Sequence, residues 1–225
     1  MRTIIRRREL GEIGRAHVSS FSNAIELLYA DIYPTFRNLI KKVESPVNNP
    51  VREKTVLEQD QIEYLLNELI DRKQYEKACC FALAAYSGRR KSELFRFKVN
   101  DFSDERLVYG TLYKSTPITT KGRQGGKRVP CYTLYKPFKY YLDKWLEERE
   151  RIGLESEWLF PSRINPKEPR NAGIMNSWSD TASSILGVPV YPHAFRHAFV
   201  TYLASTGLPH SIIISILQWE KSSGD

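Results

Sequence analysis

Residues 105–135 constrain the fold most, because they are rich in β-forming residues while the sequence on either side has helical periodicity. Arg106–Tyr113 and Lys127–Leu134 are predicted strands. Between them lies the basic, glycine-rich turn Thr119–Gly126. The sequence therefore predicts an α/β fold that is mainly α, in which helices surround one small antiparallel sheet with an exposed tip.

Apolar residues recur at spacings of three and four over most of the remaining chain, which predicts helices. The first is expected from residue 20 to 43 with a kink at Pro34, before a linker at Ser45–Pro50. A capping box at Thr55–Glu58 is expected to start the next helix. The further expected helices cover residues 74–86 with Gly88 just beyond the end, a short segment with Arg90, Glu93 and Leu94, and residues 137–151, 172–186, 193–206 and 210–219.

The chain is expected to divide near residue 50. Residues 1–50 hold one or two helices, too few for a self-sufficient domain, and are expected to be the end of a larger helical unit plus a linker. Residues 51–225 form the second domain. Trp145 and Trp178 lie at core spacing and are expected to pack inside it. The three cysteines, at 79, 80 and 131, are an odd number and are expected to be buried free thiols.

The formal charge of +8, from 34 Lys and Arg against 26 Asp and Glu, favours a polyanionic partner. Nucleic acid is favoured over a membrane surface, because the longest apolar run, Ile212–Leu217, is too short to span a bilayer. The N-terminus has no apolar signal region. Its arginines are either a solvated end or contacts to a phosphate backbone: Arg2, Arg6, Arg7 and Arg8. No metal or cofactor is expected, since neither a zinc spacing nor a P-loop occurs.

Two separated arginine motifs carry the chemistry. One is Gly88-Arg-Arg90-Lys-Ser-Glu93-Leu94 and the other is His193-Ala-Phe-Arg196 at the start of a helix. Arginine presents a planar fork that matches two phosphate oxygens at once. Two such arginines and a histidine suit a site that grips one phosphodiester and stabilises extra negative charge on it.

Together these motifs resemble those of the tyrosine recombinases, or phage integrases, over residues 55–225. Thr120-Lys121-Gly resembles the hairpin lysine of that family, and Ser215-Ile-Leu-Gln-Trp219 resembles its segment with a His-or-Trp position. The resemblance implies a tyrosine-recombinase-like catalytic domain. It also implies that residues 1–50 are the C-terminal remnant of the helical core-binding (DNA-binding) domain, with its linker.

The resemblance assigns roles to the site residues. Arg90 and Arg196 clamp the non-bridging oxygens, and His193 donates to the phosphate or acts as a base. Lys121 protonates the leaving 5′ oxygen, with Lys114 as its rival. Glu93 orients a site residue, and Trp219 packs against the site and donates its indole N–H. Secondary DNA contacts are expected from Arg89, Lys91, Arg123, Lys127 and His197.

Simpler readings of the same residues stay open at this point. Arg90 and Glu93 could form an exposed ion pair of little energetic value. His193 could be a helix-start residue that binds nothing.

The resemblance implies a site-specific recombinase or integrase of a phage or mobile genetic element. It would work as a tetramer on double-stranded DNA in the cytoplasm of a prokaryotic cell, through a 3′-phosphotyrosyl intermediate. A type IB topoisomerase is one alternative. The family's tyrosine follows the Trp219 position by about three helical turns, and no tyrosine follows Tyr202. We therefore expect a fragment that cannot cleave DNA, with a non-cleaving DNA-binding regulator as the other alternative.

Overall fold

The computed structural model describes residues 2–9, 15–31, 56–120 and 127–217, and the chain divides into two compact units, Met1–Lys54 and Thr55–Asp225. In the first unit, α1 (Arg2–Glu9) and α2 (Arg15–Asp31) pack against each other, and Val18 of α2 is buried. The expected helix therefore begins at Arg15 rather than near residue 20. Pro34 and the linker Ser45–Pro50 lie outside the described residues.

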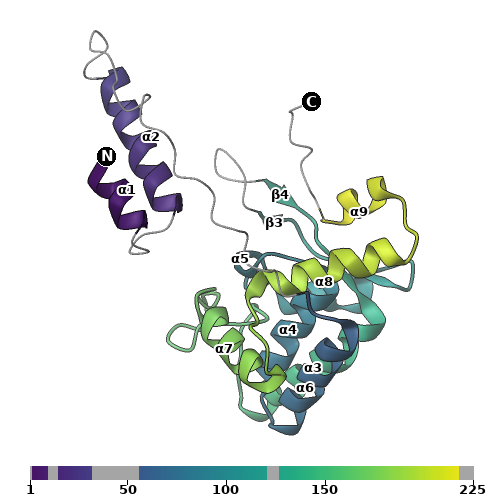
Figure 1. The fold of residues 1–225 in the computed structure, drawn as a ribbon. Coiled ribbons are helices and arrows are strands. Elements are labelled where there is room, and N and C mark those ends of the chain that lie inside the picture. The colour runs from purple at the N-terminus through teal and green to yellow at the C-terminus, as the bar shows by residue number, and fades with distance from the viewer. Residues whose placement is uncertain (1, 10–14, 32–55, 121–126, 218–225) are drawn as a thin grey trace. The chain divides into compact units, whose positions relative to one another are not determined.

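The second unit is mainly helical, as the sequence predicts (Figure 1). Its helices are α3 (Gln59–Asp71), α4 (Tyr75–Ser87), α5 (Lys91–Leu94), α6 (Tyr135–Arg151), α7 (Ile174–Leu186), α8 (Pro192–Ser205) and α9 (His210–Leu217). Short 3₁₀ segments cover Val99–Phe102 and Asp104–Arg106. None of the helices among the described residues is both long enough and apolar enough to cross a bilayer.

Helix α4 lies at the centre of this unit and packs against α3, α6 and α8. Every residue from Ala78 to Ser87 is buried, so the helix is covered on all sides. Its alanines and cysteines are small enough to let the neighbouring helices approach closely, as expected of a helix that is apolar all round. Phe81 of α4 stacks on Phe195 of α8 with ring centroids 5.0 Å apart, which ties α8 to the core.

The expected core residues are confirmed. Trp145 and Trp178 are buried, and the Trp145 indole N–H donates to the carbonyl of Leu159 over 2.8 Å. All three cysteines are buried free thiols. Burial raises the pKa of each thiol, because the interior disfavours the charged thiolate.

The β-forming region is confirmed, but its strands are shorter than predicted. β1 (Leu107–Val108), β2 (Leu112–Lys114) and β5 (Tyr132–Leu134) form an antiparallel sheet in the order β1-β2-β5, and β3 (Ile118–Thr119) pairs with β4 (Arg128–Val129). Arg106–Tyr113 is a hairpin rather than one strand. Tyr109 and Gly110 both have positive φ, and the Thr111 N–H donates to the Val108 carbonyl, which turns the chain there.

The second predicted strand is also interrupted, at Pro130 and Cys131, between β4 and β5. Proline has no N–H to donate to a ladder. Helix capping differs from expectation as well. The cap of α3 is at Glu58, whose N–H donates to the Gln61 side chain, so placing the capping box at Thr55–Glu58 was wrong by one turn. The prediction for Gly88 is confirmed: it ends α4 with a φ of 61°.

Candidate active site

Gly88 joins three helices at one point. Its left-handed conformation ends α4, and a Cβ placed there would lie 2.4 Å from Phe199 Cδ1 of α8 and 3.0 Å from Leu217 Cδ2 of α9. Only glycine fits both the backbone conformation and the space. Its carbonyl accepts a hydrogen bond from Arg196 Nη1 of α8 over 2.5 Å. The loop after α4 is therefore held directly against the helix that carries the second arginine motif.

Arg90 and Glu93 form a partly buried pair rather than an exposed one. The Glu93 carboxylate is 0% exposed and accepts from both Arg90 Nη1 and the Arg90 backbone N–H, each over 3.1 Å. The Arg90 side chain remains 33% exposed. A carboxylate that holds the guanidinium and the backbone of one residue restricts how the arginine can point. This geometry is not the exposed ion pair that the sequence left open.

Arg196 lies in α8 and is 6% exposed. Burial first, and then the neighbouring Arg90 and Arg89, lower the pKa of its guanidinium to about 10. Glu93 acts in the opposite direction. Three guanidinium groups thus repel one another across a small space. An anion between Arg90 and Arg196 would offset that repulsion.

His193 lies in the first turn of α8, after Pro192, and its side chain is exposed. Its pKa is lowered by desolvation first and then by Arg196, His197, Arg90 and Lys91. Cationic groups of both motifs therefore act on the imidazole, although 106 positions in the sequence separate Arg90 from Arg196. A histidine whose pKa is below its ordinary value is mostly neutral at pH 7. One of its ring nitrogens can then donate a proton and the other can accept one.

Arg89 does not lie where the sequence analysis expects it. It is 1% exposed, and its guanidinium donates to the Ile216 carbonyl, the Ser87 carbonyl and Cys131 Sγ. A side chain with that burial cannot touch DNA directly, so the expectation of a DNA contact is corrected. The Arg89 side chain lies in the interior beneath the loop that follows α4, and not at the surface.

The remaining expected contacts are distributed differently. Lys91 is half-buried, and its Nζ donates to Asn176 Oδ1 of α7 over 3.2 Å, a partner that no sequence signal indicates. Exposed positions are found for His197, Lys114 and Lys127. Lys121, Arg123 and Trp219 lie outside the described residues. The choice between Lys121 and Lys114 therefore stays a prediction.

The hairpin that leads to Lys121 lies beside α5. β3 and β4 pair through Ile118 with Val129, and the Thr120 N–H donates to the Lys127 carbonyl over 2.8 Å at the base of the turn. Arg96, just after α5, donates to the Thr119 carbonyl. Figure 1 shows this strand pair next to α5. The arrangement brings the base of the basic turn to the side of the unit that holds Arg90.

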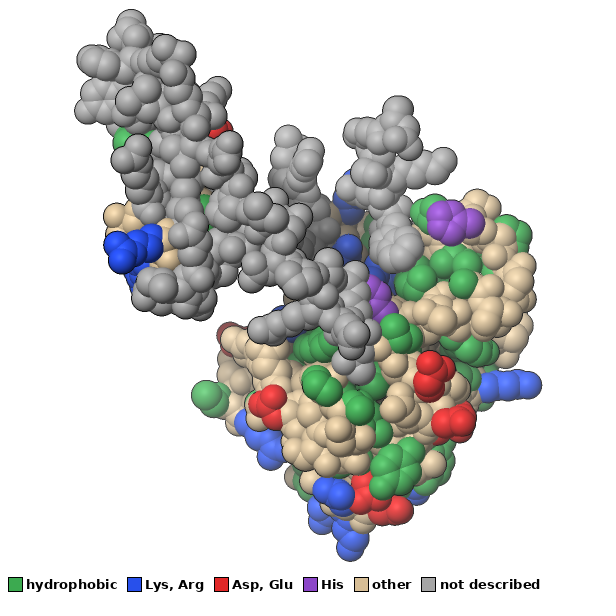
Figure 2. Space-filling view, viewed as in Figure 1, with side chains coloured by type: hydrophobic (Ala, Val, Ile, Leu, Met, Phe, Trp, Pro, Cys, Tyr) green, Lys and Arg blue, Asp and Glu red, His purple; other side chains and the backbone are tan. Residues whose placement is uncertain are grey.

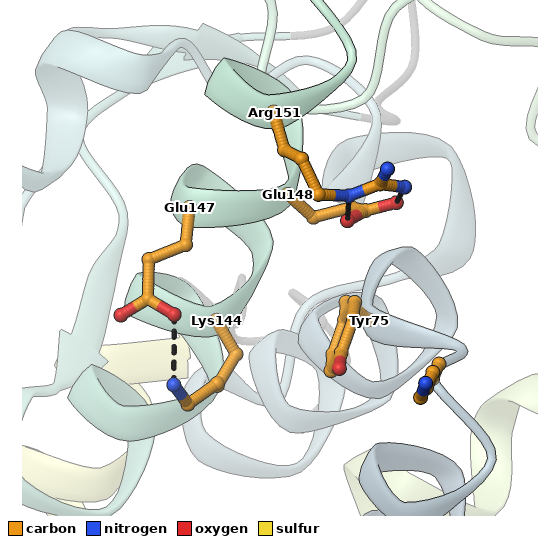
Figure 3. A pocket seen from close by; sticks show the side chains of 6 residues that line it. Tyr75, Lys144, Glu147, Glu148 and Arg151 are labelled. Atoms are coloured by element: carbon orange, nitrogen blue, oxygen red, sulfur yellow. Dashed lines mark hydrogen bonds and ion pairs between the residues drawn. The ribbon is translucent and has the colours of Figure 1, made fainter.

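Figure 2 shows Lys, Arg and His side chains near the upper edge of the second unit in that view, and further Lys and Arg side chains lower down among its acidic side chains. By contrast, the hollow of about 550 Å³ in Figure 3 lies between the start of α4 and α6. Four of its five charged lining side chains are paired, Lys144 with Glu147 at 2.7 Å and Arg151 with Glu148 at 2.6 Å, and Lys73 is the fifth. Opposite charges that neutralise each other give no reason to bind a phosphate there. Within the described residues, no group of three or more His, Cys, Asp or Glu side chains could hold a metal ion.

Comparisons with known proteins match most of this chain. The model of the phage integrase family matches residues 55–224. The SPbeta prophage-derived recombinase-like protein YomM of Bacillus subtilis is 29% identical over 195 residues, covering 84% of this chain and 57% of that protein. Tyrosine recombinase XerA of Pyrococcus furiosus is 26% identical over 206 residues, covering 89% and 65%. This chain thus spans less than two thirds of the length of either relative.

Among solved structures, the Tn1549 transposon integrase in complex with transposon right end DNA has a TM-score of 0.69 at 17% identity, covering 96% of this chain and 75% of that chain. The XerH site-specific recombinase bound to difH substrate has a TM-score of 0.67 at 18% identity, covering 96% and 62%. At these identities the similarity establishes the fold.

Proposed function

This chain belongs to the phage integrase family of tyrosine recombinases, and from that premise we propose that it carries the phosphate-binding site of a site-specific DNA recombinase. The observation that supports this most is the meeting of Arg90, His193 and Arg196 at one place, next to a glycine that joins three helices. The substrate is a phosphodiester of double-stranded DNA.

The proposed reaction is a transesterification. A tyrosine oxygen bonds to phosphorus while the bond from phosphorus to the 5′ oxygen breaks, giving a 3′-phosphotyrosyl link and a free 5′ hydroxyl. The tyrosine proton passes to a base and a proton is given to the leaving oxygen. The 5′ hydroxyl of a partner strand then attacks the phosphotyrosyl link and releases the tyrosine. Each step forms one phosphate ester bond as it breaks another, so the number of these bonds is unchanged.

Each residue has a part in this scheme. Arg90 and Arg196 hold the two non-bridging oxygens as negative charge builds on them. Glu93 fixes the direction of Arg90 through the two hydrogen bonds described above. His193, neutral at pH 7, donates to the phosphate or accepts the tyrosine proton. Lys121 supplies the proton to the leaving oxygen, and Trp219 packs beside the site.

Residues 203–225 contain no tyrosine. We therefore propose that the 225-residue polypeptide binds DNA but forms no covalent link through a tyrosine at the family position. Denaturing electrophoresis after incubation with nicked duplex DNA tests this, since a covalent adduct survives the detergent. An adduct formed by this polypeptide alone would contradict the proposal. Tetramer formation on DNA and a cytoplasmic setting are proposed from the family only.

Titration of His193 by NMR, with and without saturating duplex DNA, tests whether the phosphate occupies the proposed site. A phosphodiester beside His193 favours the charged imidazolium, so its pKa should rise on binding. His193→Gln assigns the signal. If the protein binds DNA while the pKa of His193 is unchanged or falls, the phosphate lies elsewhere. The result is independent of cleavage, so it also holds for a DNA-binding regulator with this pocket.

Loss of cleavage in a full recombinase that contains this unit separates the enzyme from the regulator. Arg90→Ala and Arg196→Ala should each abolish adduct formation and leave most of the DNA affinity. Arg151→Ala is the matched control, because it removes one exposed arginine from α6, which Figure 1 places on the opposite side of the unit from α5. Near-normal cleavage by the Arg90 or Arg196 variant would refute their roles. Relaxation of plasmids without a specific site would favour the topoisomerase.

A further inference from the structure

Arg89 is more deeply buried than the other arginines near the site, at 1% exposed against 6% for Arg196. Lysine and arginine are almost never fully buried unless they are paired. Among the described residues, Arg89 forms no ion pair with a carboxylate, and its hydrogen bonds go to neutral acceptors. The distances are 2.5 Å from Nη2 to the Ile216 carbonyl, 3.3 Å from Nε to the Ser87 carbonyl and 3.6 Å from Nη1 to Cys131 Sγ.

These three acceptors belong to three separate parts of the unit. Ser87 ends α4, Cys131 lies between β4 and β5, and Ile216 is in the last turn of α9. The carbonyls of a last helical turn lack partners within the helix and carry the negative end of its dipole. α9 has no basic residue of its own in that turn. Arg89 supplies the missing cation from a segment 127 positions earlier.

Within the part of the chain that the structure describes, α9 also packs against α8. Its buried residues Ile213 and Leu217 form a small cluster with Phe199 and Leu203 of α8, separate from the main core. Leu217 also packs at the position of Gly88. α9 therefore ends against the loop that begins at Gly88 and continues into Arg90.

We propose that Arg89 is a positioning residue that fixes the C-terminal end of α9 against this loop. In doing so, it sets where the end of α9 lies in relation to Arg90 and Arg196. The consequence for Arg90 and Arg196 rests on the proposed function of those arginines, whereas the fixing of α9 by Arg89 does not. Arg89 acts through the backbone of α9 and does not touch the substrate.

A different explanation is that Arg89 only fills space in the interior. Keeping a charged group away from water is costly, so an apolar side chain of similar volume in its place need not destabilise the fold. Under that explanation Arg89→Leu keeps α9 in place. Under our proposal Arg89→Leu releases the end of α9, because leucine cannot donate to the Ile216 carbonyl.

Hydrogen–deuterium exchange of the 225-residue chain, read by mass spectrometry, separates the two. In Arg89→Leu, amides of residues 210–217 should exchange about tenfold faster or more, as expected for the loss of a hydrogen bond from a charged donor. Amides of α4 and α6 should keep their protection. Arg89→Lys, which keeps the charge and one donor group, should show a smaller increase confined to the same residues.

Two outcomes of the exchange measurement overturn the proposal. The first is unchanged exchange of residues 210–217 in Arg89→Leu. The second is an equal rise across all helices in both variants, since that shows a general loss of stability rather than a role at α9.

DNA affinity gives a second measurement. Because Arg89 is buried, Arg89→Lys should bind duplex DNA within about twofold of the unchanged chain, with the same salt dependence. A large loss of affinity with unchanged α9 exchange would restore Arg89 as a DNA contact and overturn the proposal. The exchange measurement needs no DNA. Failure of the proposed recombinase function would therefore appear in the His193 titration and not in the protection of α9.

Discussion

Replacing Gly88 by alanine should destabilise the second unit by more than backbone strain alone. A left-handed conformation costs a non-glycine residue about 1–2 kcal/mol. At Gly88 the added Cβ would also lie 2.4 Å from Phe199 Cδ1 and 3.2 Å from Phe199 Cε1. Carbon atoms pack best at about 3.5–4.0 Å, so the ring must move. Overpacking of this kind typically adds about 1–3 kcal/mol.

Gly187 provides a matched control. It caps α7 with a φ of 67°, close to the 61° of Gly88, but a Cβ there would meet nothing within 4 Å. Gly187→Ala should therefore cost only the strain of about 1–2 kcal/mol, and Gly88→Ala about 1–3 kcal/mol more.

Urea unfolding followed by tryptophan fluorescence measures both changes. All four tryptophans lie in the second unit, so the signal reports that unit. With a slope of about 2 kcal/mol per molar urea, the midpoints of the two variants should differ by about 0.5–1.5 M. Equal midpoints would show that the junction of α4, α8 and α9 is looser than described, and would refute the reasoning.

Three further results are expected. Burial raises the pKa of the thiols at 79, 80 and 131, so iodoacetamide should modify them slowly in the folded chain at neutral pH and completely in urea. Rapid modification of the folded chain, detected by mass spectrometry, would contradict their burial. DNA affinity should fall steeply with salt, with a log–log slope of about −0.9 for each phosphate contacted, and a flat plot from fluorescence anisotropy would remove the case for a polyanionic partner. Lys91→Ala should raise the pKa of His193 because it removes a neighbouring positive charge, whereas Lys144→Ala on α6 should leave that pKa unchanged. If NMR titration finds the same His193 pKa in Lys91→Ala, the placement of Lys91 near His193 is contradicted.

Much of the fold follows from patterns that are local in the sequence. Helical spacing and the glycine after α4 predict the helices because they depend on residues within a few turns. The hairpin at Tyr109 was missed because tyrosine is a strand former, and a positive φ at such a residue is set by the packing around it. The cap of α3 was misplaced by one turn because several polar residues near Glu58 could serve as the cap.

The candidate site was predictable only in part. Arg90, Glu93, His193 and Arg196 stand in motifs whose residue types suit phosphate chemistry, so their importance could be inferred without coordinates. The burial of Arg89 could not. Its neighbour Arg90 is the same residue type, and only the path of the chain after Gly88 decides which of the two reaches the surface. The contact between Lys91 and Asn176 joins residues 85 positions apart and leaves no local pattern.

A crystal structure of this chain with duplex DNA would test the central claim most directly. We predict that guanidinium nitrogens of Arg90 and Arg196 both lie within about 3 Å of non-bridging oxygens of one phosphate, with His193 beside it. Guanidinium groups bound to different phosphates, or a duplex seated away from α5 and the start of α8, would contradict the account.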